Sequence, residues 1–600
     1  MPKKDNPFSF DSFFEQFAQS AQSTKEGSYE VKFPQFLKYT KRALTFIGIL
    51  FALLLVVSYW WFHPAISVYS TRFWEFLLLF ILAPAFVFFK YKSFSYRNSK
   101  GSFIAFDKTQ NASGARVLHN KKKAKLYNML ASIPLLVLAF VCIGWVLSLA
   151  VIPGNAYKYA HVLETQEHSF ASDIKEVNYE QIPVIDRESA VLLGNRTMGA
   201  IPEYVSQFEI SPLYSQINLN GSPTRVSPLV YADLYKWFIN REPGIPAYVK
   251  VDMATQDTEI VRLEHPIRYS QSEPFLRNID RHVQLSYPFY LFDEKSFEVD
   301  DEGTPWWICP VQKRTIGLFG GTTIDRVVLC NASTGECFDY DIKDCPAWVD
   351  RAYPAELLIE QYNWSGMYKD GWLNSWLGQQ GVVQTTPGND KTLGYNYIAK
   401  DDDVWVYTGV TSATADNSII GFVLINQRTH ESHFYSIAGA TEESAMRSAE
   451  GQVQNLRYKA TFPLLLNIND QPTYFMALKD EAGLVKQYAM IDIQRYQNVA
   501  VGDTVSTTQK SYLQLLAAHG EIKAGDSEIN SSATGKIRSI NQAVIEGNTH
   551  FYITLEGEKG IFDFALPALL PIVSYRVGDE INFSYTAGDP LNLALEIQDS

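Results

Sequence analysis

The sequence predicts an α+β fold with three N-terminal transmembrane helices, repeats of a helix and a β-hairpin, and a small C-terminal β-barrel of OB-like type. Three observations predict this layout. Apolar residues concentrate before residue 153, and acidic residues concentrate after it. Similar polar turns between β-branched and aromatic runs recur at intervals of about 80 to 95 residues. The last 67 residues alternate short apolar stretches with polar turns.

Three apolar segments predict membrane spans. Residues 43–62 are uncharged over 20 residues, which matches the roughly 20 residues that a helix needs to cross a ~30 Å hydrocarbon core. Residues 73–89 are shorter and contain one glutamate and one proline, which membrane helices tolerate. Residues 126–153 contain no charge in 28 residues and can cross with tilt. Residues 43–153 are therefore the predicted membrane domain.

Basic residues predict the orientation, because Lys and Arg near a span stay on the cytoplasmic side. The loop 90–125 holds ten basic residues against one acidic residue, so it is expected in the cytoplasm. Residues 1–42, with a Phe-rich amphipathic helix for the inner leaflet or a partner, are expected there too. Everything after residue 153 is then exported. The strongest topology signal is the cluster of Lys121, Lys122, Lys123 and Lys125.

The charge of the exported part excludes one class of partner. The chain carries 52 basic and 65 acidic residues, of which 18 and 7 precede residue 154, so the exported part has a net charge of about −24. Binding to nucleic acid needs a surface rich in Lys and Arg. We therefore predict no nucleic-acid partner, and expect the lipid bilayer and a protein partner instead.

Four of the five cysteines, Cys309, Cys330, Cys337 and Cys345, cluster within 37 residues of the exported part. An even number of cysteines in an oxidising compartment predicts disulfides. Their spacing, C-x20-C-x6-C-x7-C, does not match the common zinc sites. Cys330 and Cys337 occupy positions that two related hairpins fill with cross-strand neighbours. We predict a Cys330–Cys337 disulfide across the turn and a second disulfide between Cys309 and Cys345.

The related hairpins begin at Asp252, Asn331 and Asn426, each followed by Thr at +3 and by Asp or Glu at +5. The copy NASTGE, residues 331–336, resembles the D-x-x-T-G-E hairpin of PepSY-type domains, which are small extracytoplasmic modules of bacteria linked to peptidase regulation or envelope sensing. The other two copies lack the glycine. Residues 394–490 also resemble uncharacterised membrane proteins of Gram-positive bacteria. The resemblance implies a location and an architecture, and no reaction.

The exported part is expected to contain two domains. Residues 154–520 form the α+β repeat domain, with helices predicted at residues 227–239, 354–364 and 441–456. A polar, Ser-rich linker follows at residues 521–533, and residues 534–600 form the small β-barrel.

Several residue sets match chemical motifs incompletely. Ser172 and Lys175 form an S-x-x-K pair, but the companion motifs of penicillin-recognising enzymes are missing. His430 and His433 flank a glutamate without the HExxH pattern of zinc proteases. The aspartates at 401–403 lack the alternating spacing of a calcium loop. We therefore predict no catalytic residue, no cofactor and no metal site.

The middle of the exported part is rich in tryptophan, which is typical of cores and of interface anchors. We predict an interaction surface there that includes Trp306, Trp307, Trp372 and Trp376. The function predicted from the sequence is a non-catalytic interaction or assembly scaffold of the bacterial cell envelope, anchored in the cell membrane by several spans. The alternatives are a regulator of an extracytoplasmic peptidase and an envelope-signal sensor.

Overall fold

A computed structural model describes residues 41–98, 110–176, 182–388, 393–413, 418–518, 531–545, 548–557, 560–567, 569–586 and 591–598. The chain divides into two units, Met1–Phe62 and His63–Ser600, which are described separately. The predicted Phe-rich helix of residues 1–42 falls almost wholly outside the described residues, as does most of the predicted linker 521–533.

The N-terminal helices are α2 (Lys41–Phe62), α3 (Thr71–Leu77), the π-helical turn η1 (Leu78–Leu82), α4 (Ala83–Asn98) and α5 (Gln110–Val146). Among the described residues, two stretches are long and apolar enough to cross a membrane, Thr71–Tyr96 and Lys121–Val146. The prediction of three spans is therefore wrong. The remaining apolar helix, within α2, counts from Gly48 to Phe62 among the described residues and is not one of the two candidate spans.

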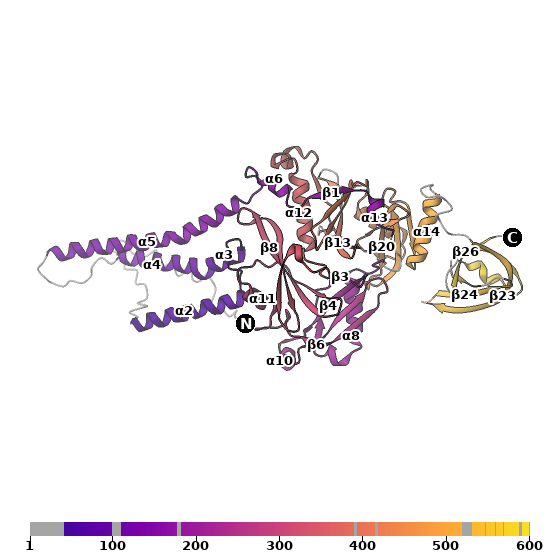
Figure 1. Cartoon of the computed structure of the whole chain (residues 1–600), viewed down its shortest axis with the longest axis horizontal. Helices are drawn as coiled ribbons and strands as arrows, with labels where there is room; N and C mark the ends of the chain where they lie inside the picture. The colour runs from indigo at the N-terminus through magenta and orange to yellow at the C-terminus, as the bar shows by residue number, and fades with distance from the viewer. Residues whose placement is uncertain are drawn as a thin grey trace, which may run out of the picture. The chain divides into compact units, whose positions relative to one another are not determined.

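Helices α4 and α5 lie side by side (Figure 1). Lys90 Nζ donates to the side-chain oxygen of Asn128 over 2.9 Å, and the Ser93 hydroxyl donates to the carbonyl of Ala124 over 2.9 Å. Apolar side chains point away from the pair, as Leu136 at 66% exposure illustrates. The predicted topology signal of Lys121, Lys122, Lys123 and Lys125 lies within α5, at the start of its apolar stretch.

Four antiparallel sheets follow, and each is a meander of four strands paired in chain order. Sheet 1 contains β3 (Ser215–Leu219), β4 (Ser222–Tyr231), β5 (Ile245–Asp252) and β6 (Thr258–Ile267), and sheet 2 contains β7 (Ser296–Val299), β8 (Pro305–Ile316), β9 (Gly320–Asn331) and β10 (Cys337–Asp341). Sheet 3 contains β12 (Asn396–Lys400), β13 (Asp403–Ser412), β15 (Gly421–Asn426) and β16 (Ser432–Tyr435), and sheet 4 contains β19 (Leu464–Ile468), β20 (Gln471–Lys479), β21 (Val485–Asp492) and β22 (Val499–Gly502).

Short strands extend these sheets. In sheet 1, β2 (Phe208–Ile210) pairs with β4. In sheet 3, β11 (Val383–Thr385) pairs with β13, and β1 (Thr165–His168) pairs in parallel with β16. In sheet 4, β18 (Lys459–Ala460) pairs with β20. A separate pair joins β14 (Ser418–Ile419) to β17 (Gly439–Ala440). Most strands are buried on both faces, and β13 is buried at nine of its ten residues. The sheets are therefore packed face to face rather than exposed on one side.

Hydrogen bonds join each sheet to the next and close a ring. Between sheets 1 and 2, the backbone N–H of Arg268 donates to the carbonyl of Ala332, and between sheets 2 and 3, Tyr353 donates from its hydroxyl to Ile324 O and from its backbone N–H to Gln427 O. Between sheets 3 and 4, the Asn396 side chain donates to the carbonyl of Phe462. Between sheets 4 and 1, the Gln256 side chain donates to the hydroxyl of Tyr488. The first strands of sheets 1, 2 and 3, and the segment that leads into β19 of sheet 4, line one central cavity. Four-stranded meanders ringed around a central cavity are the arrangement of a β-propeller, here with four blades.

The same turn closes the last hairpin of every blade. Asp252, Asn331, Asn426 and Asp492 each accept hydrogen bonds from the backbone N–H groups two and three residues further on, over 2.7 to 3.2 Å. Such Asx turns hold the chain in a tight reversal. The three hairpins predicted from the sequence are therefore three copies of a fourfold repeat.

Helices play a smaller part than the predicted α+β repeats require, and the predicted fold class is wrong in this respect as well. The body contains α8 (Arg187–Gly199), α10 (Leu234–Asn240), α11 (Ile279–Ser286), α12 (Ala355–Tyr368), α13 (Glu442–Gln452) and α14 (Val505–Ala518), with shorter helical turns between them. The predicted helix at 227–239 forms only from Leu234, because residues 227–231 extend β4 and Asp233 then caps the helix by accepting from Lys236 N.

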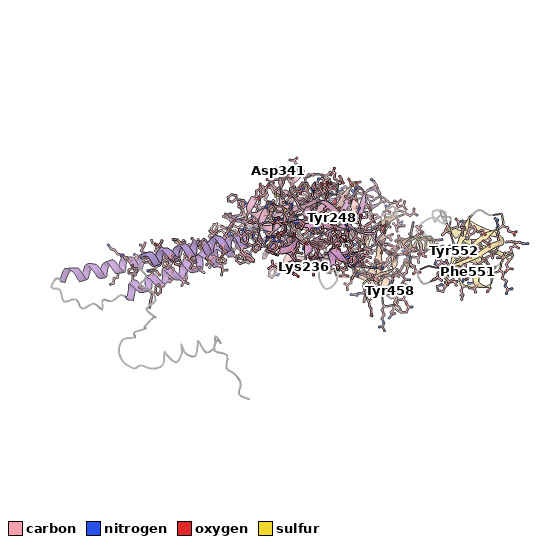
Figure 2. The ribbon with its side chains drawn as sticks, turned by 90° about the horizontal axis from the view of Figure 1, so that it is seen from below. Lys236, Tyr248, Asp341, Tyr458, Phe551 and Tyr552 are labelled. Carbon is pink, nitrogen blue, oxygen red and sulfur yellow. The ribbon has the colours of Figure 1, made fainter. Side chains whose placement is uncertain are left out.

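The core of the blades is large and aromatic. Tyr248 of β5, labelled inside the body in Figure 2, is 3% exposed, and Trp307 of β8 is 1% exposed. After α14, the strands β23 (Ser531–Ile545), β24 (Asn548–Leu555), β25 (Ile561–Ala565), β26 (Glu580–Thr586) and β27 (Leu591–Gln598) pair in the closed order β23-β24-β25-β27-β26. Phe562, Phe564 and Phe583 fill this small barrel with edge-on ring contacts.

Candidate functional site

The central cavity of the four blades has a volume of about 1160 Å³, and many of the residues that line it are charged. Side chains from every blade reach it, including Gln216 of β3, Ser296 of β7, Tyr397 of β12 and Lys459 of β18. The propeller therefore brings together residues that lie more than 200 positions apart in the sequence, and the cavity is large enough for a small molecule or a short chain segment.

Seven cationic side chains line this cavity, and six of them have a partner. Arg187 donates to the carbonyl of Pro212, and the other five pair with carboxylates: Lys295 with Asp280, Arg351 with Glu356, Arg447 with Glu443, Lys459 with Glu450, and Lys479 with both Asp186 and Glu188. The seventh is Arg225 of β4. Its Nε has no hydrogen-bond partner, and its guanidinium forms no ion pair within the described residues.

Arg225 is deeply buried, with 5% of its surface exposed. Its strand position explains this burial, because β4 pairs with β3 on one side and with β5 on the other, opposite Gln216 and Val251. Desolvation lowers the pKa of the Arg225 guanidinium. A buried charge without a counter-ion is costly, and such groups are normally paired. The free protein therefore holds in its cavity a positive charge that makes no direct ion pair, although the carboxylate of Asp186, which pairs with Lys479, partly offsets it.

Two further polar atoms beside Arg225 lack partners among the described residues. They are the hydroxyl of Tyr214 and Oε1 of Gln216, and both residues line the cavity. Burial raises the pKa of Tyr214, so its hydroxyl stays protonated and can donate a hydrogen bond. The Tyr214 hydroxyl packs against Gly194, so the donors that Arg225 offers to the cavity are those of its own guanidinium. This arrangement suits an oxyanion, and a carboxylate matches the planar fork of a guanidinium.

No motif in the sequence predicted this site. One signal was available, since Arg225 is a lone charge between apolar and small residues in SPTRVSPLVY, a stretch that reads as a buried strand. A charge at such a position needs either a partner or a ligand. The choice between the two depends on side chains from the other blades, which the local sequence does not specify.

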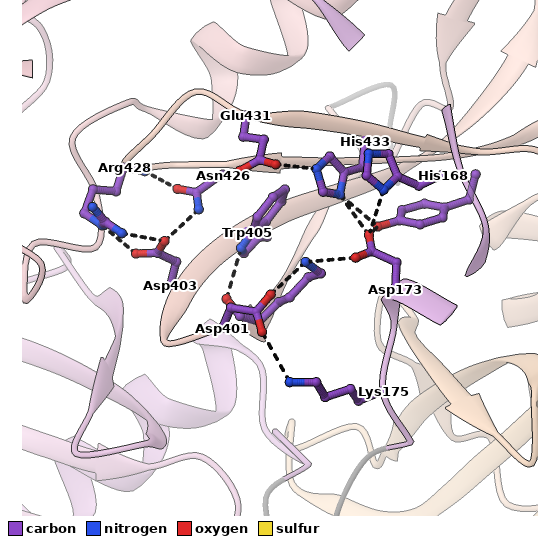
Figure 3. Close-up of polar contacts among 12 residues, drawn as sticks. His168, Asp173, Lys175, Asp401, Asp403, Trp405, Asn426, Arg428, Glu431 and His433 are labelled. Carbon is purple, nitrogen blue, oxygen red and sulfur yellow. Dashed lines mark hydrogen bonds and ion pairs between the residues drawn. The ribbon is translucent and has the colours of Figure 1, made fainter. Parts of the chain in front are cut away.

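A second polar cluster joins the segment that contains His168 and Asp173 to sheet 3 (Figure 3). His433 of β16 lies between two carboxylates, with Nδ1 2.8 Å from Asp173 and Nε2 2.7 Å from Glu431. The ring of His168 stacks on His433 with centroids 3.7 Å apart. Lys400 Nζ lies 3.3 Å from the other oxygen of Asp173. An ammonium group already neutralises this carboxylate, so we interpret the cluster as a structural fastening rather than a metal site.

Asp173 should make this fastening sensitive to acid. Burial alone would raise its pKa, but hydrogen bonds from Tyr435 and His433 and the charge of Lys400 outweigh burial, and the pKa is lowered. A carboxyl group with a depressed pKa stabilises the fold above its unfolded pKa of about 3.9, and this stabilisation is lost as the pH falls through the folded pKa.

We expect Asp173→Asn to lower the stability of the body by about 2 kcal/mol at neutral pH, because it removes hydrogen bonds to a charged group. The difference from the wild type should begin to shrink at about pH 4, where Asp173 of the unfolded wild type becomes protonated, and should vanish once the pH falls below the lowered pKa of the folded state. Thermal unfolding followed at a series of pH values measures this difference. A gap that stays constant into acid would show that the charge of Asp173 contributes nothing.

The motifs weighed from the sequence do not form catalytic sites. The Ser172 hydroxyl donates to the carbonyl of Ser169, whereas Lys175 pairs with Asp401 over 3.4 Å. The three aspartates at 401–403 reach three different groups: Asp401 contacts Lys400 and Lys175, Asp402 accepts from Asn218, and Asp403 pairs with Arg428. Their oxygens do not converge on a calcium position.

The predicted tryptophan surface is not a single surface. Trp307 is buried in the core and donates to the carbonyl of Tyr269, while Trp306 packs against Trp348 with centroids 5.8 Å apart. Trp372 and Trp376 stack at 6.2 Å in the segment after α12, and Trp376 is 69% exposed. The prediction is wrong for Trp307, because successive residues of a strand face opposite sides of its sheet. Trp376 remains available for contact.

The two predicted disulfides differ in outcome. All five cysteines carry free thiols in this structure. Cys330 and Cys337 are direct cross-strand partners, as the hairpin pattern indicated, so their bridge stays a prediction. Cys309 and Cys345 lie in separate core clusters on opposite faces of sheet 2, so a bridge between them is wrong. Cys142, which was predicted in the third span, lies on α5.

Comparisons with known proteins add no family. No protein-family model matches the chain, and no curated protein matches it. Among solved structures, the chain is similar to the crystal structure of an exo-1,5-α-L-arabinanase from a bovine ruminal metagenomic library, at 10% identity over 66% of this chain and 100% of that chain. The TM-score of this match is 0.15, which is too low to indicate a shared fold or activity.

Proposed function

We propose that this chain is a membrane-anchored protein of the bacterial cell envelope whose four-bladed body is a non-catalytic docking scaffold outside the membrane. Two apolar helices of sufficient length support the anchor. The basic cluster in α5 supports the orientation, because it precedes the apolar stretch that leads into the body. The ring of blades provides a rigid platform, and rigid platforms preserve the geometry of a binding site.

The observation that carries this proposal is the unpaired Arg225 in the central cavity. A carboxylate of a protein partner, either an acidic side chain or a chain terminus, would neutralise the guanidinium and accept two parallel hydrogen bonds. Truncating such a desolvated charge contact in an interface typically costs about 2 to 5 kcal/mol. The net charge of the exported part, about −24, does not prevent this contact, because charges more than about 8 Å apart are largely screened at physiological salt.

Site-specific photocrosslinking in cells tests the docking role. A photoreactive amino acid at Leu393, which lines the cavity and is 46% exposed, should capture a partner. Arg225→Gln should reduce that adduct by at least about 10-fold, since the contact is worth more than 1.4 kcal/mol. The same photoreactive residue at Leu234, which is 65% exposed on α10 and is not part of the cavity lining, is the matched control.

Two results would contradict the proposal. One is an adduct at Leu393 that Arg225→Gln leaves unchanged, because the guanidinium would then have no part in docking. The other is a C-terminal reporter that is active only in the cytoplasm, because the body would then lie on the inner side of the membrane. A phosphatase fusion, which is active outside, and a fluorescent fusion, which is active inside, distinguish the two orientations.

A further inference from the structure

A third cluster brings two cysteines together with a histidine that is distant from them in the sequence. The thiols of Cys330 and Cys337 and a ring nitrogen of His282 all lie within 4.8 Å of one another. Cys330 is the penultimate residue of β9, Cys337 begins β10, and His282 comes from α11, about 50 residues earlier. Two thiols and an imidazole are a ligand set that zinc and other soft metal ions prefer.

The supporting shell holds these groups in place. Cys330 and Cys337 face each other across the Asx turn that begins at Asn331. His282 Nε2 lies 2.8 Å from the carbonyl of Gly335, within the same turn, and its ring packs on Tyr269 with centroids 4.4 Å apart. Metal-binding histidines commonly hydrogen-bond a carbonyl in this way, which orients the ring.

Gly335 permits this close packing. Its φ is +79°, and a Cβ at this position would lie 2.2 Å from the ring of Tyr269. Only glycine can therefore bring the turn this near to His282 and Tyr269. Among the hairpin copies recognised in the sequence, the one with this glycine is also the one that carries two cysteines.

We propose that His282, Cys330 and Cys337 form a site for a single soft divalent or monovalent metal ion, with Zn²⁺ as the probe ion. Tetrahedral bonds of about 2.3 Å to sulfur and 2.0 Å to nitrogen place ligand atoms about 3.3 to 3.8 Å apart, so small side-chain rotations suffice. Three protein ligands leave a fourth position for water or an exogenous ligand.

The same cysteines have a competing state, the disulfide predicted from the sequence. A disulfide would join Cys330 to Cys337 and give His282 no part, whereas a metal site needs all three residues. The role of His282 therefore separates the two states. This proposal does not depend on the docking function, because none of the three residues of the cluster is among those that line the central cavity.

The test uses the full chain in detergent micelles, reduced and freed of metal, and titrated with Zn²⁺ against a chromophoric chelator. We expect one Zn²⁺ per chain, and a thiolate-to-metal charge-transfer band when Co²⁺ replaces Zn²⁺. His282→Ala and Cys337→Ser should each weaken Zn²⁺ binding by more than about 100-fold, since loss of a ligand exceeds the effect of changes in the supporting shell. Cys345→Ser, which removes a buried thiol on the other face of sheet 2, should bind like the wild type.

Three results would overturn the site. The first is reduced protein that binds no Zn²⁺, and the second is binding that His282→Ala leaves unchanged. The third is a Cys330–Cys337 disulfide in every molecule of protein that is purified without reductant and analysed by non-reducing peptide mapping. Those thiols would then never be free to bind metal. Circular dichroism of each variant confirms that loss of binding does not come from loss of the fold.

Discussion

Replacing Arg225 by methionine is expected to stabilise the free protein while it abolishes docking. The residue Arg225 is 5% exposed and makes no direct ion pair, so its desolvation is only partly offset, by the charge of Asp186, in the free state. Exchanging buried charged groups for apolar residues of similar size stabilises proteins by about 1 to 4 kcal/mol in comparable cases. We expect about 2 kcal/mol for Arg225→Met, seen as a Tm several degrees higher.

The matched control is Arg351→Met. Arg351 lines the same cavity, but it lies 3.8 Å from Glu356, and its backbone N–H donates to Glu298. Removing its side chain leaves Glu356 without its cation, so this variant should not be stabilised. Differential scanning calorimetry of both variants in the absence of partner gives the comparison. A lower Tm for Arg225→Met would show that Arg225 stabilises the fold and is not kept for a ligand.

Asp403→Asn is expected to destabilise the body by about 3 kcal/mol, because it breaks a buried ion pair and leaves one charge behind. Asp403 is 6% exposed and accepts from Nε of Arg428 over 2.6 Å and from Nη2 over 2.8 Å. It also accepts from Asn426, the first residue of the Asx turn in sheet 3. One carboxylate thus joins the start of β13 to the last hairpin of the blade (Figure 3).

Asp401→Asn provides the comparison for this effect. The Asp401 side chain is 59% exposed and its partner Lys175 is 87% exposed, while Lys400, at 11%, keeps a second carboxylate partner in Asp173. Exposed pairs contribute between about 0 and 1 kcal/mol, so Asp401→Asn should change the stability little. Chemical denaturation of the two variants separates the roles of two aspartates that stand two positions apart. Equal effects would show that the Arg428 pair contributes no more than a surface contact.

The hairpins illustrate how far local sequence predicts this fold. The turns at Asp252, Asn331 and Asn426 depend on hydrogen bonds within six residues, so the pattern alone identifies them. The fourth turn, at Asp492, escaped recognition because Arg495 stands where the other copies carry threonine. A repeat found in three copies suggested separate helix-and-hairpin units, whereas four copies indicate a ring.

The membrane region shows a different limit. Composition identified the apolar stretches, and two of the three form helices long enough to cross a membrane. Of the first stretch, Gly48–Phe62 is the part that counts as an apolar helix among the described residues. Residues 126–153 were predicted to be helical throughout, but α5 ends at Val146 and the remainder forms turns.

By itself, the sequence determined the features that depend on neighbouring residues: the apolar N-terminal region, the basic cluster in α5, the Asx turns and the pairing of Cys330 with Cys337. Only the tertiary structure decided that the sheets close into a ring, that Arg225 faces a cavity without a counter-ion, and that His282 lies beside the two thiols. The physical reason is that burial and charge compensation are properties of groups distant in sequence. Carboxylates that line the cavity pair with other cations, and no local pattern records those pairings.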